Sequence, residues 1–236
     1  MLLKSMTSNN SHKNPWTPQD EGDHFPMMKE WWTVETIFKT IEDNRKWNLM
    51  LIISYKLNPP SSFFQYTLFD MNAKKCILRK DIDDELDKLK LGKNKVDLKY
   101  GKSTVKGIYP DYNIHIDDEK QDFIADMIYK AKSLPHWVAQ DATDGNLPIG
   151  LNFYKYGYIP NCDLTGNINL KGKKYTIKGK GYFEHIWGKW SYENPLQSIS
   201  DLNFIQSLAF SKNSLVLVIF IISLLVIKFV LYILLN

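Results

Sequence analysis

The sequence predicts an all-β protein, either a closed antiparallel barrel or a sandwich, followed by a long apolar segment. Segments rich in aromatic and β-branched residues recur at short intervals, separated by Gly, Asn, Asp and Pro. About ten strands in fewer than about 200 residues are typical of barrels and sandwiches. All 7 Trp precede the apolar segment. Large aromatic residues favour a barrel with an interior cavity, although a solid core would use the same side chains.

The first two strands are expected at 31–38 and 47–55. In the second, large side chains alternate with mixed ones, so Trp47, Leu49, Leu51, Ile53 and Tyr55 share one face. The acidic and amide residues at 42–45 provide turn chemistry between the strands. These segments therefore predict a first hairpin.

Further strands are expected at 63–71, 74–79, 96–100, 103–109, 112–116, 150–156, 158–170 and 173–185. Residues 81–91 start with acids and carry Ile82, Leu86 and Leu89 at helical spacing, which predicts a short helix. The segment 123–131 fits a helical stripe and a strand alternation equally, and we expect a strand. Residues 133–148 are expected to be a loop, and 1–24 a loosely held arm.

Two clusters could carry chemistry, at 25–32 and at 179–188. In a continuing strand, Phe183, His185 and Trp187 face one side, while Tyr182, Glu184 and Ile186 face the other. A histidine between aromatic rings could transfer a proton near neutral pH, and the π faces could stabilise a cation. The alternative is a histidine that only holds the closing strand by hydrogen bonds.

These clusters resemble the first domain of the hydroxyneurosporene synthase (carotenoid 1,2-hydratase) and AttH-like family. The matching segments are Glu30-Trp31-Trp32 and the run 181–188, and the resemblance covers residues 20–192. It implies a lipocalin-like antiparallel barrel with an apolar cavity for isoprenoids or other lipids. It also implies that His185 and Trp187 line a site where acid protonates an alkene and water adds to the resulting cation.

The sequence departs from that family after the second cluster. The resemblance implies an aspartate proton donor some tens of residues later, in a chain that continues into a second barrel. Here Lys212-Asn213-Ser214 precedes an apolar segment, and Asp201 lies in what reads as a linker. Either a second barrel-bearing chain supplies the other half, or the fold serves binding alone.

The segment 215–235 is predicted to cross a membrane. Its 21 residues are interrupted only by Ser223, Lys228 and Tyr232, and a helix of this length spans about 32 Å, close to the thickness of the hydrocarbon core. Lys228 lies near the end of the segment, where its long side chain reaches the interface. The N-terminus lacks the apolar core of a signal peptide. We therefore expect a tail-anchored chain with domain 25–192 in the cytoplasm and linker 193–214.

Charge and composition exclude several other classes. The net charge of +4, from 30 basic and 26 acidic residues, gives no footprint for nucleic acid. Two cysteines, Cys76 and Cys162, cannot form a disulfide framework and indicate a reduced compartment. The five histidines show no metal-ligand spacing, and glycine-rich nucleotide loops are absent from the sequence. We expect neither a metal nor a cofactor.

The leading hypothesis is a membrane-anchored barrel that binds an isoprenoid or another apolar lipid. Its expected ligand-binding residues are Trp31, Trp32, Trp47, Tyr182 and Trp187. A second hypothesis is a lyase or isomerase in which His185 or Glu184 protonates an alkene. The third is a scaffold that docks a partner or a second copy, and the last is a degenerate chain without activity.

Overall fold

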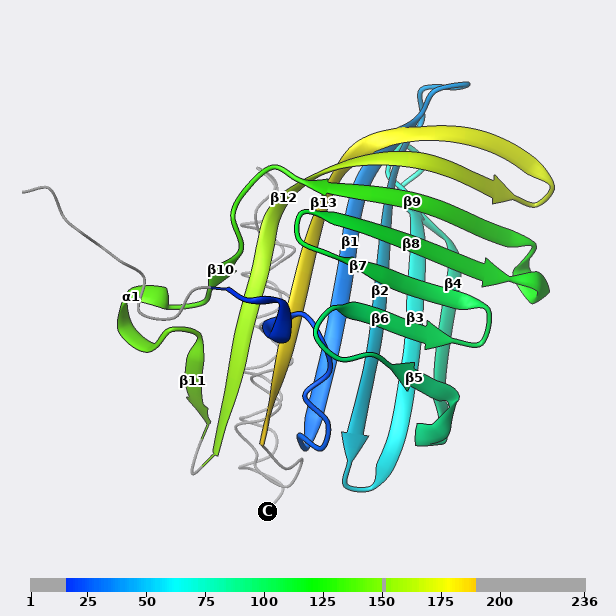
Figure 1. The fold of residues 1–236 in the computed structure, drawn as a ribbon. Coiled ribbons are helices and arrows are strands. Elements are labelled where there is room, and N and C mark those ends of the chain that lie inside the picture. Colours follow the sequence, from blue (N-terminus) through cyan, green and yellow to red (C-terminus); the bar gives the residue numbers. More distant parts are fainter. Residues whose placement is uncertain (1–15, 150–151, 190–236) are drawn as a thin grey trace, which may run out of the picture. The chain divides into compact units, whose positions relative to one another are not determined.

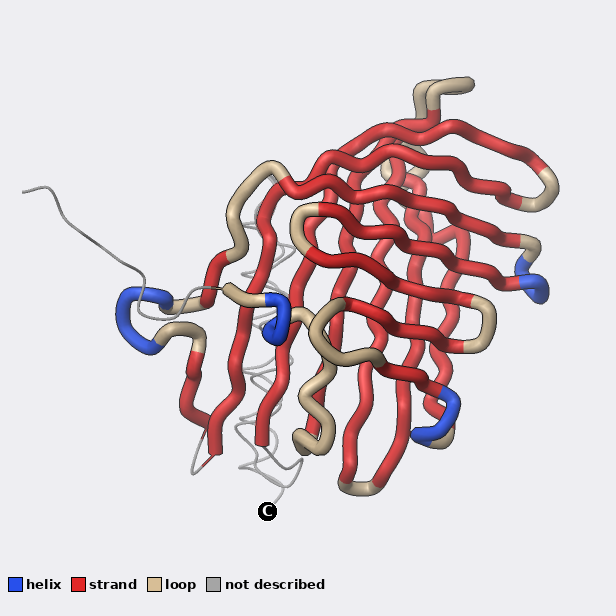
Figure 2. Tube along the Cα trace, in the orientation of Figure 1, coloured by secondary structure: helices blue, strands red, loops and turns tan. Residues whose placement is uncertain are grey.

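The computed structural model describes residues 16–149 and 152–189, which form an antiparallel sheet with little helix (Figures 1 and 2). Its strands are β1 (Lys29–Thr40), β2 (Lys46–Leu57), β3 (Pro60–Asp70), β4 (Lys75–Asp84), β5 (Leu89–Leu91), β6 (Val96–Tyr100), β7 (Ser103–Ile108), β8 (Asp111–Asp118), β9 (Phe123–Ala131), β10 (His136–Trp137), β11 (Asn146–Ile149), β12 (Asn152–Leu170) and β13 (Lys173–Lys189). The described helices are α1 (Gln140–Thr143) and three 3₁₀ turns at Pro18–Asp20, Leu86–Lys88 and Glu119–Gln121.

The sheet follows the order β4-β3-β2-β1-β13-β12-β9-β8-β7-β6-β5, with β10 and β11 paired to β12. Figure 1 shows it curling over, so that β5–β9 lie in front of β1–β4. The long strands β12 and β13 run through both parts. A register shift between Ile159 and Cys162 interrupts their pairing, and such bulges bend a strand.

The concave face of the sheet holds the main hydrophobic core. Buried side chains alternate along β2, from Trp47 through Leu51 to Tyr55, as the sequence predicted. On β1 the same face presents Trp32, Val34 and Phe38, and on β13 Ile177 and Phe183. The period-2 pattern therefore sorts side chains between the interior and the outer face.

Backbone pairing leaves the curled sheet open between its end strands β4 and β5, so the structure is a half-barrel and not the closed barrel expected. Side chains bridge the gap. The hydroxyl of Tyr66 donates to Asp118 Oδ2 at 2.7 Å, and Lys80 pairs with Asp118 at 3.0 Å. The hydroxyl of Tyr100 donates to Asp84 at 3.1 Å. The two ends thus meet through polar contacts in place of a hydrogen-bonded ladder.

The sequence prediction was wrong for two segments. The helix expected at 81–91 is the end of β4, one 3₁₀ turn and β5, because pairing with β3 continues to Ser62 opposite Asp84. The loop expected at 133–148 contains β10, α1 and part of β11. The strand expected at 123–131 is confirmed as β9, and the last hairpin is longer than predicted, since β12 is one continuous strand.

Residues 16–24, called here the N-terminal strap, run from beside β10 past β12 and β13 toward the β5–β8 region (Figure 1). Glu21 is buried and accepts hydrogen bonds from the hydroxyl of Tyr112 at 2.8 Å and from the backbone N–H of Tyr109 at 3.0 Å. The N–H of Asp23 donates to the carbonyl of Gly92. This part of the expected loose arm is therefore fixed to the sheet, while residues 1–15 lie outside the described residues.

Two compact units divide the chain at residue 190. The second, with the expected linker 193–214 and membrane span 215–235, lies outside the described residues. Within 16–149 and 152–189, no helix has the length and apolarity needed for a bilayer crossing.

Candidate functional site

A buried carboxylate and a buried imidazole meet on the concave face, where β1 pairs with β13. Glu30 and Trp32 both point inward from β1, and Trp32 lies opposite His185 in the antiparallel register. His185 Nε2 lies 2.8 Å from Glu30 Oε1, and neither side chain is exposed to solvent. Two paired adjacent strands therefore position this contact.

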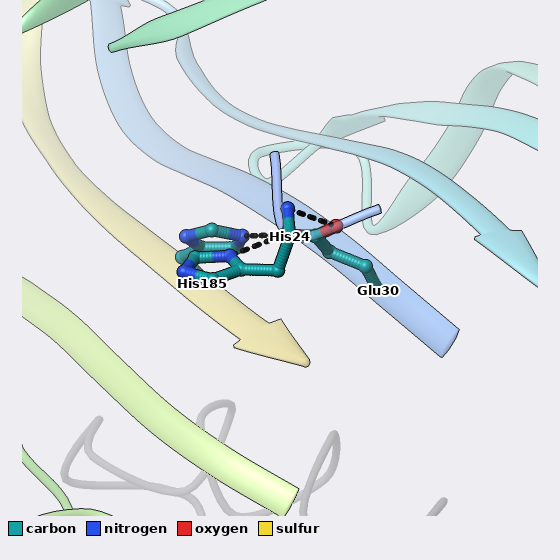
Figure 3. A group of neighbouring side chains, drawn as sticks. All are labelled: His24, Glu30 and His185. Atoms are coloured by element: carbon teal, nitrogen blue, oxygen red, sulfur yellow. Dashed lines mark hydrogen bonds and ion pairs between the residues drawn. The ribbon is translucent and has the colours of Figure 1, made fainter. Parts of the chain in front are cut away.

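A second histidine reaches the same carboxylate oxygen from the strap. His24 Nδ1 lies 2.8 Å from Glu30 Oε1, and the backbone N–H of His24 donates to Glu30 Oε2 at 3.0 Å. Figure 3 shows contacts from His24 and His185 converging on the Glu30 carboxylate. His24 is the member nearest to solvent, with 21% of its side chain exposed. We call His24, Glu30 and His185 the relay.

Hydrogen-bond partners limit where protons can lie in the relay. His185 Nδ1 is 2.8 Å from the backbone carbonyl of Asp20, and a carbonyl only accepts, so Nδ1 carries a proton. The 2.8 Å contact between Nε2 and Glu30 then needs a second proton, either on Nε2 or on the carboxyl. The contact between His24 Nδ1 and Glu30 Oε1 needs a proton as well. Each histidine–carboxylate contact in the relay therefore contains a proton shared between nitrogen and oxygen.

Burial and hydrogen bonding set the acidities. Burial opposes ionisation of Glu30, but hydrogen bonds from His185 and His24 outweigh it and leave the pKa of Glu30 below its ordinary value. Burial lowers the pKa of His185 against the opposing effect of Glu30. A histidine of lowered pKa releases its proton more readily than a solvated one. The hydroxyl of Tyr55 also donates to Glu30 Oε2 at 2.8 Å, so both carboxylate oxygens are engaged.

Aromatic rings frame the relay. Trp32 stacks on His185 with centroids 4.5 Å apart, and Trp187 stacks on His24 at 3.8 Å with planes 8° apart. Trp187 also lies 4.6 Å from His185. These π faces surround the imidazoles with apolar surface and favour a positive charge nearby.

Glu184, the other residue expected to be catalytic, faces the opposite side of the sheet from His185. Its carboxyl is buried and accepts four hydrogen bonds. Oε1 accepts from Trp31 Nε1 at 3.3 Å and Thr33 Oγ1 at 3.2 Å, and Oε2 accepts from the hydroxyls of Tyr156 at 2.5 Å and Tyr182 at 2.8 Å. Burial raises the pKa of Glu184. Because the sheet separates them, Glu184 and the relay cannot act on one reacting bond.

The expected ligand-binding residues divide among three places. Trp32 and Trp187 flank the relay, whereas Trp31 and Tyr182 lie on the outer face with Glu184. Trp47 is inside but distant, since it lies six residues along β2 from Ile53, the partner of Trp32. At strand spacing that separation is about 20 Å.

The relay is also the place where a metal could bind. One ligand atom each from His24, Glu30 and His185 lies within 4.8 Å of the others. However, the nitrogen-oxygen distances of 2.8 Å are those of hydrogen bonds, and each contact requires a proton where a metal would need a lone pair. The geometry fits proton transfer better than metal ligation, and the expected absence of a metal stays a prediction.

Sequence reasoning missed His24, Glu30 and Tyr55 as site residues. For Glu30 a signal was present, because two-residue periodicity along 30–32 places it on the face of Trp32. Tyr55 was expected on the same face of its strand as Trp47, but not near His185. His24 precedes the strand in a segment without periodicity, so its position depends on the fold of the strap.

No protein-family model matches the sequence, and no curated protein matches it. Solved structures do match. An AttH-like protein from Nitrosomonas europaea superposes with a TM-score of 0.65 at 17% identity, over 77% of this chain and 58% of that one. Kievitone hydratase from Nectria haematococca superposes with a TM-score of 0.60 at 13% identity, over 78% of this chain and 54% of that one.

These likenesses show that the chain shares a lipocalin-like all-β fold with an AttH-like protein and with a hydratase. The matched part spans little more than half of each neighbour. The fold expected from the resemblance is therefore supported, while the narrower likeness to hydroxyneurosporene synthase stays a prediction.

Proposed function

We propose that the half-barrel binds an apolar, unsaturated ligand beside the relay and protonates its double bond. The resulting cation then adds water and loses a proton, as in a hydro-lyase, or loses a proton from a neighbouring carbon, as in an isomerase. The observation that carries this proposal is the buried Glu30 carboxylate shared by two histidines between stacked tryptophans. An isoprenoid, or another apolar lipid, is the class of ligand that suits such surroundings.

Each relay residue has a separate part in the proposed reaction. His24 is the partly exposed member, so it exchanges the proton with the ligand or the water. Glu30 connects it to His185, which the carbonyl of Asp20 holds in one orientation. The rings of Trp32 and Trp187 lower the energy of a carbocation formed when the alkene is protonated. The fold shared with kievitone hydratase is consistent with this class of chemistry.

Deuterium incorporation tests the proposal without a known substrate. The full chain is incubated in D₂O with a panel of polyprenyl alkenes, and mass spectrometry detects carbon-bound deuterium. We expect incorporation by the wild type and its loss in His24→Gln and His185→Gln. His115→Gln is the matched control, because His115 pairs with Asp126 on the protein surface. If the wild type exchanges no alkene in the panel, the catalytic proposal fails.

Binding without catalysis is the second candidate, and the aromatic interior favours it. The predicted apolar segment 215–235 would confine such a protein to the bilayer, from which apolar ligands partition. Native mass spectrometry of the full chain, extracted in mild detergent, should then show a bound lipid. A mass corresponding to the protein alone would count against both binding and catalysis.

A further inference from the structure

Trp32 has a buried indole N–H that lacks a hydrogen-bond partner in the described part of the chain. Its side chain is 1% exposed, and its ring stacks on His185. Other indoles do find acceptors: Trp16 donates to Glu21, Trp31 to Glu184, and Trp47 to Thr40 Oγ1. An unpaired buried donor carries a desolvation penalty comparable to a lost hydrogen bond, so it is rarely retained without a role.

The neighbouring polar groups have no need of this donor. Both ring nitrogens of His185 are in hydrogen bonds, and both oxygens of Glu30 accept. Two unpartnered oxygens elsewhere, on Asp117 and Asn169, flank the exposed Ile124 and therefore lie on the outer face of the sheet. The N–H of Trp32 is different, because it lies inside the core beside the relay.

A ligand oxygen suits this donor better than a trapped water molecule. A buried water usually makes about three hydrogen bonds, and His185, on which Trp32 stacks, already has both ring nitrogens in hydrogen bonds. An oxygen attached to an apolar skeleton needs only one donor, and its carbon atoms would contact the surrounding rings.

We infer that Trp32 is a specificity-determining residue whose indole N–H donates to an oxygen of the bound ligand. The preferred ligand is then an apolar molecule bearing a hydroxyl, carbonyl or ether oxygen close to His185. This inference rests on the proposed binding of an apolar ligand beside the relay. It adds that a hydrocarbon lacking oxygen binds less tightly than its oxygenated counterpart.

The test compares farnesol with farnesene, which share a carbon skeleton but differ in the oxygen. The full chain is labelled with ¹⁵N-tryptophan in mild detergent, and the indole N–H signals are recorded during titration. Farnesol should shift the Trp32 signal downfield, and farnesene should not. The Trp47 signal, from an indole already bonded to Thr40, is the internal reference.

Trp32→Phe retains an aromatic ring but removes the donor. We expect its affinity for farnesol to fall about tenfold more than its affinity for farnesene. If both probes bind the wild type equally and farnesol leaves the Trp32 signal unshifted, this inference is overturned, while the proposal that the site binds an apolar ligand is retained. If neither probe binds, the proposed function fails together with the inference. The NMR comparison is made on the wild type, so once the indole signals of the seven tryptophans are assigned it decides even if Trp32→Phe misfolds.

Discussion

Replacing Glu184 should reveal a structural role on the outer face that is separate from the relay. In Glu184→Ala, the buried hydroxyl of Thr33 loses its acceptor, whereas the hydroxyl of Tyr156 keeps that of Tyr182 at 3.2 Å. One stranded donor costs about 1–3 kcal/mol, so the free energy of unfolding should fall by about 1–3 kcal/mol. Trp31 and Tyr182 are half-buried, can reach water and should add little.

Glu184→Gln should behave differently because it keeps an acceptor but does not ionise. Burial raises the pKa of Glu184 above its ordinary value of 4.5, so the folded state holds that proton more tightly than the unfolded chain. The wild type therefore keeps this contribution below pH 4.5 and loses it as the pH rises through the folded-state pKa. The free energy of unfolding of Glu184→Gln, measured relative to that of the wild type, should therefore rise from pH 4.5 to pH 8.

Urea unfolding followed by circular dichroism at several pH values measures both effects. The reasoning is refuted if Glu184→Ala lowers the free energy of unfolding by less than about 1 kcal/mol. It is also refuted if Glu184→Gln becomes less stable relative to the wild type as the pH rises. Ligand binding by Glu184→Gln should match the wild type, because the sheet separates this carboxyl from the relay.

Three other predictions concern the concave face. Gly157→Ala should lower stability by about 1–3 kcal/mol in thermal unfolding, because the added Cβ would lie 2.1 Å from Trp16 Cζ3; an unchanged Tm would contradict this. Tyr55→Phe removes a donor to Glu30, so the pH midpoint of proton transfer should rise, with about 1 kcal/mol lost in stability; an unmoved pH profile would argue against the relay. Dialysis against EDTA should leave Tm unchanged, since His24 and its partners are already joined by protons, and a fall reversed by Zn²⁺ would show a metal site.

Alternation along the chain made much of the sheet predictable. The inner face of β2 and the opposed directions of His185 and Glu184 follow from a two-residue period, which strand geometry enforces. The prediction of a helix at 81–91 was wrong because it rested only on the spacing of apolar residues within that segment. Pairing of β4 with β3 through Asp84 depends on a distant segment and prevails over local propensity.

The candidate site was predictable only in part, for a related reason. Strand alternation placed His185 and Trp187 on one face. Trp32 was expected in the same site, but so were Trp31, Trp47 and Tyr182, which lie elsewhere. The charged Glu30 beside His185 was overlooked, although its strand position pointed inward. His24 could not be found, because only the folded strap brings a residue without periodic neighbours against the relay.

Through the carbonyl of Asp20, the N-terminal strap affects the chemistry of His185. This carbonyl dictates which nitrogen of His185 bears hydrogen, although it belongs to a backbone segment far away in sequence. Trimming the chain past residue 20 would thus free the imidazole to adopt its other tautomer, altering reactivity without touching any side chain of the sheet. Shortened versions of this protein should be compared by pH profile as well as by yield.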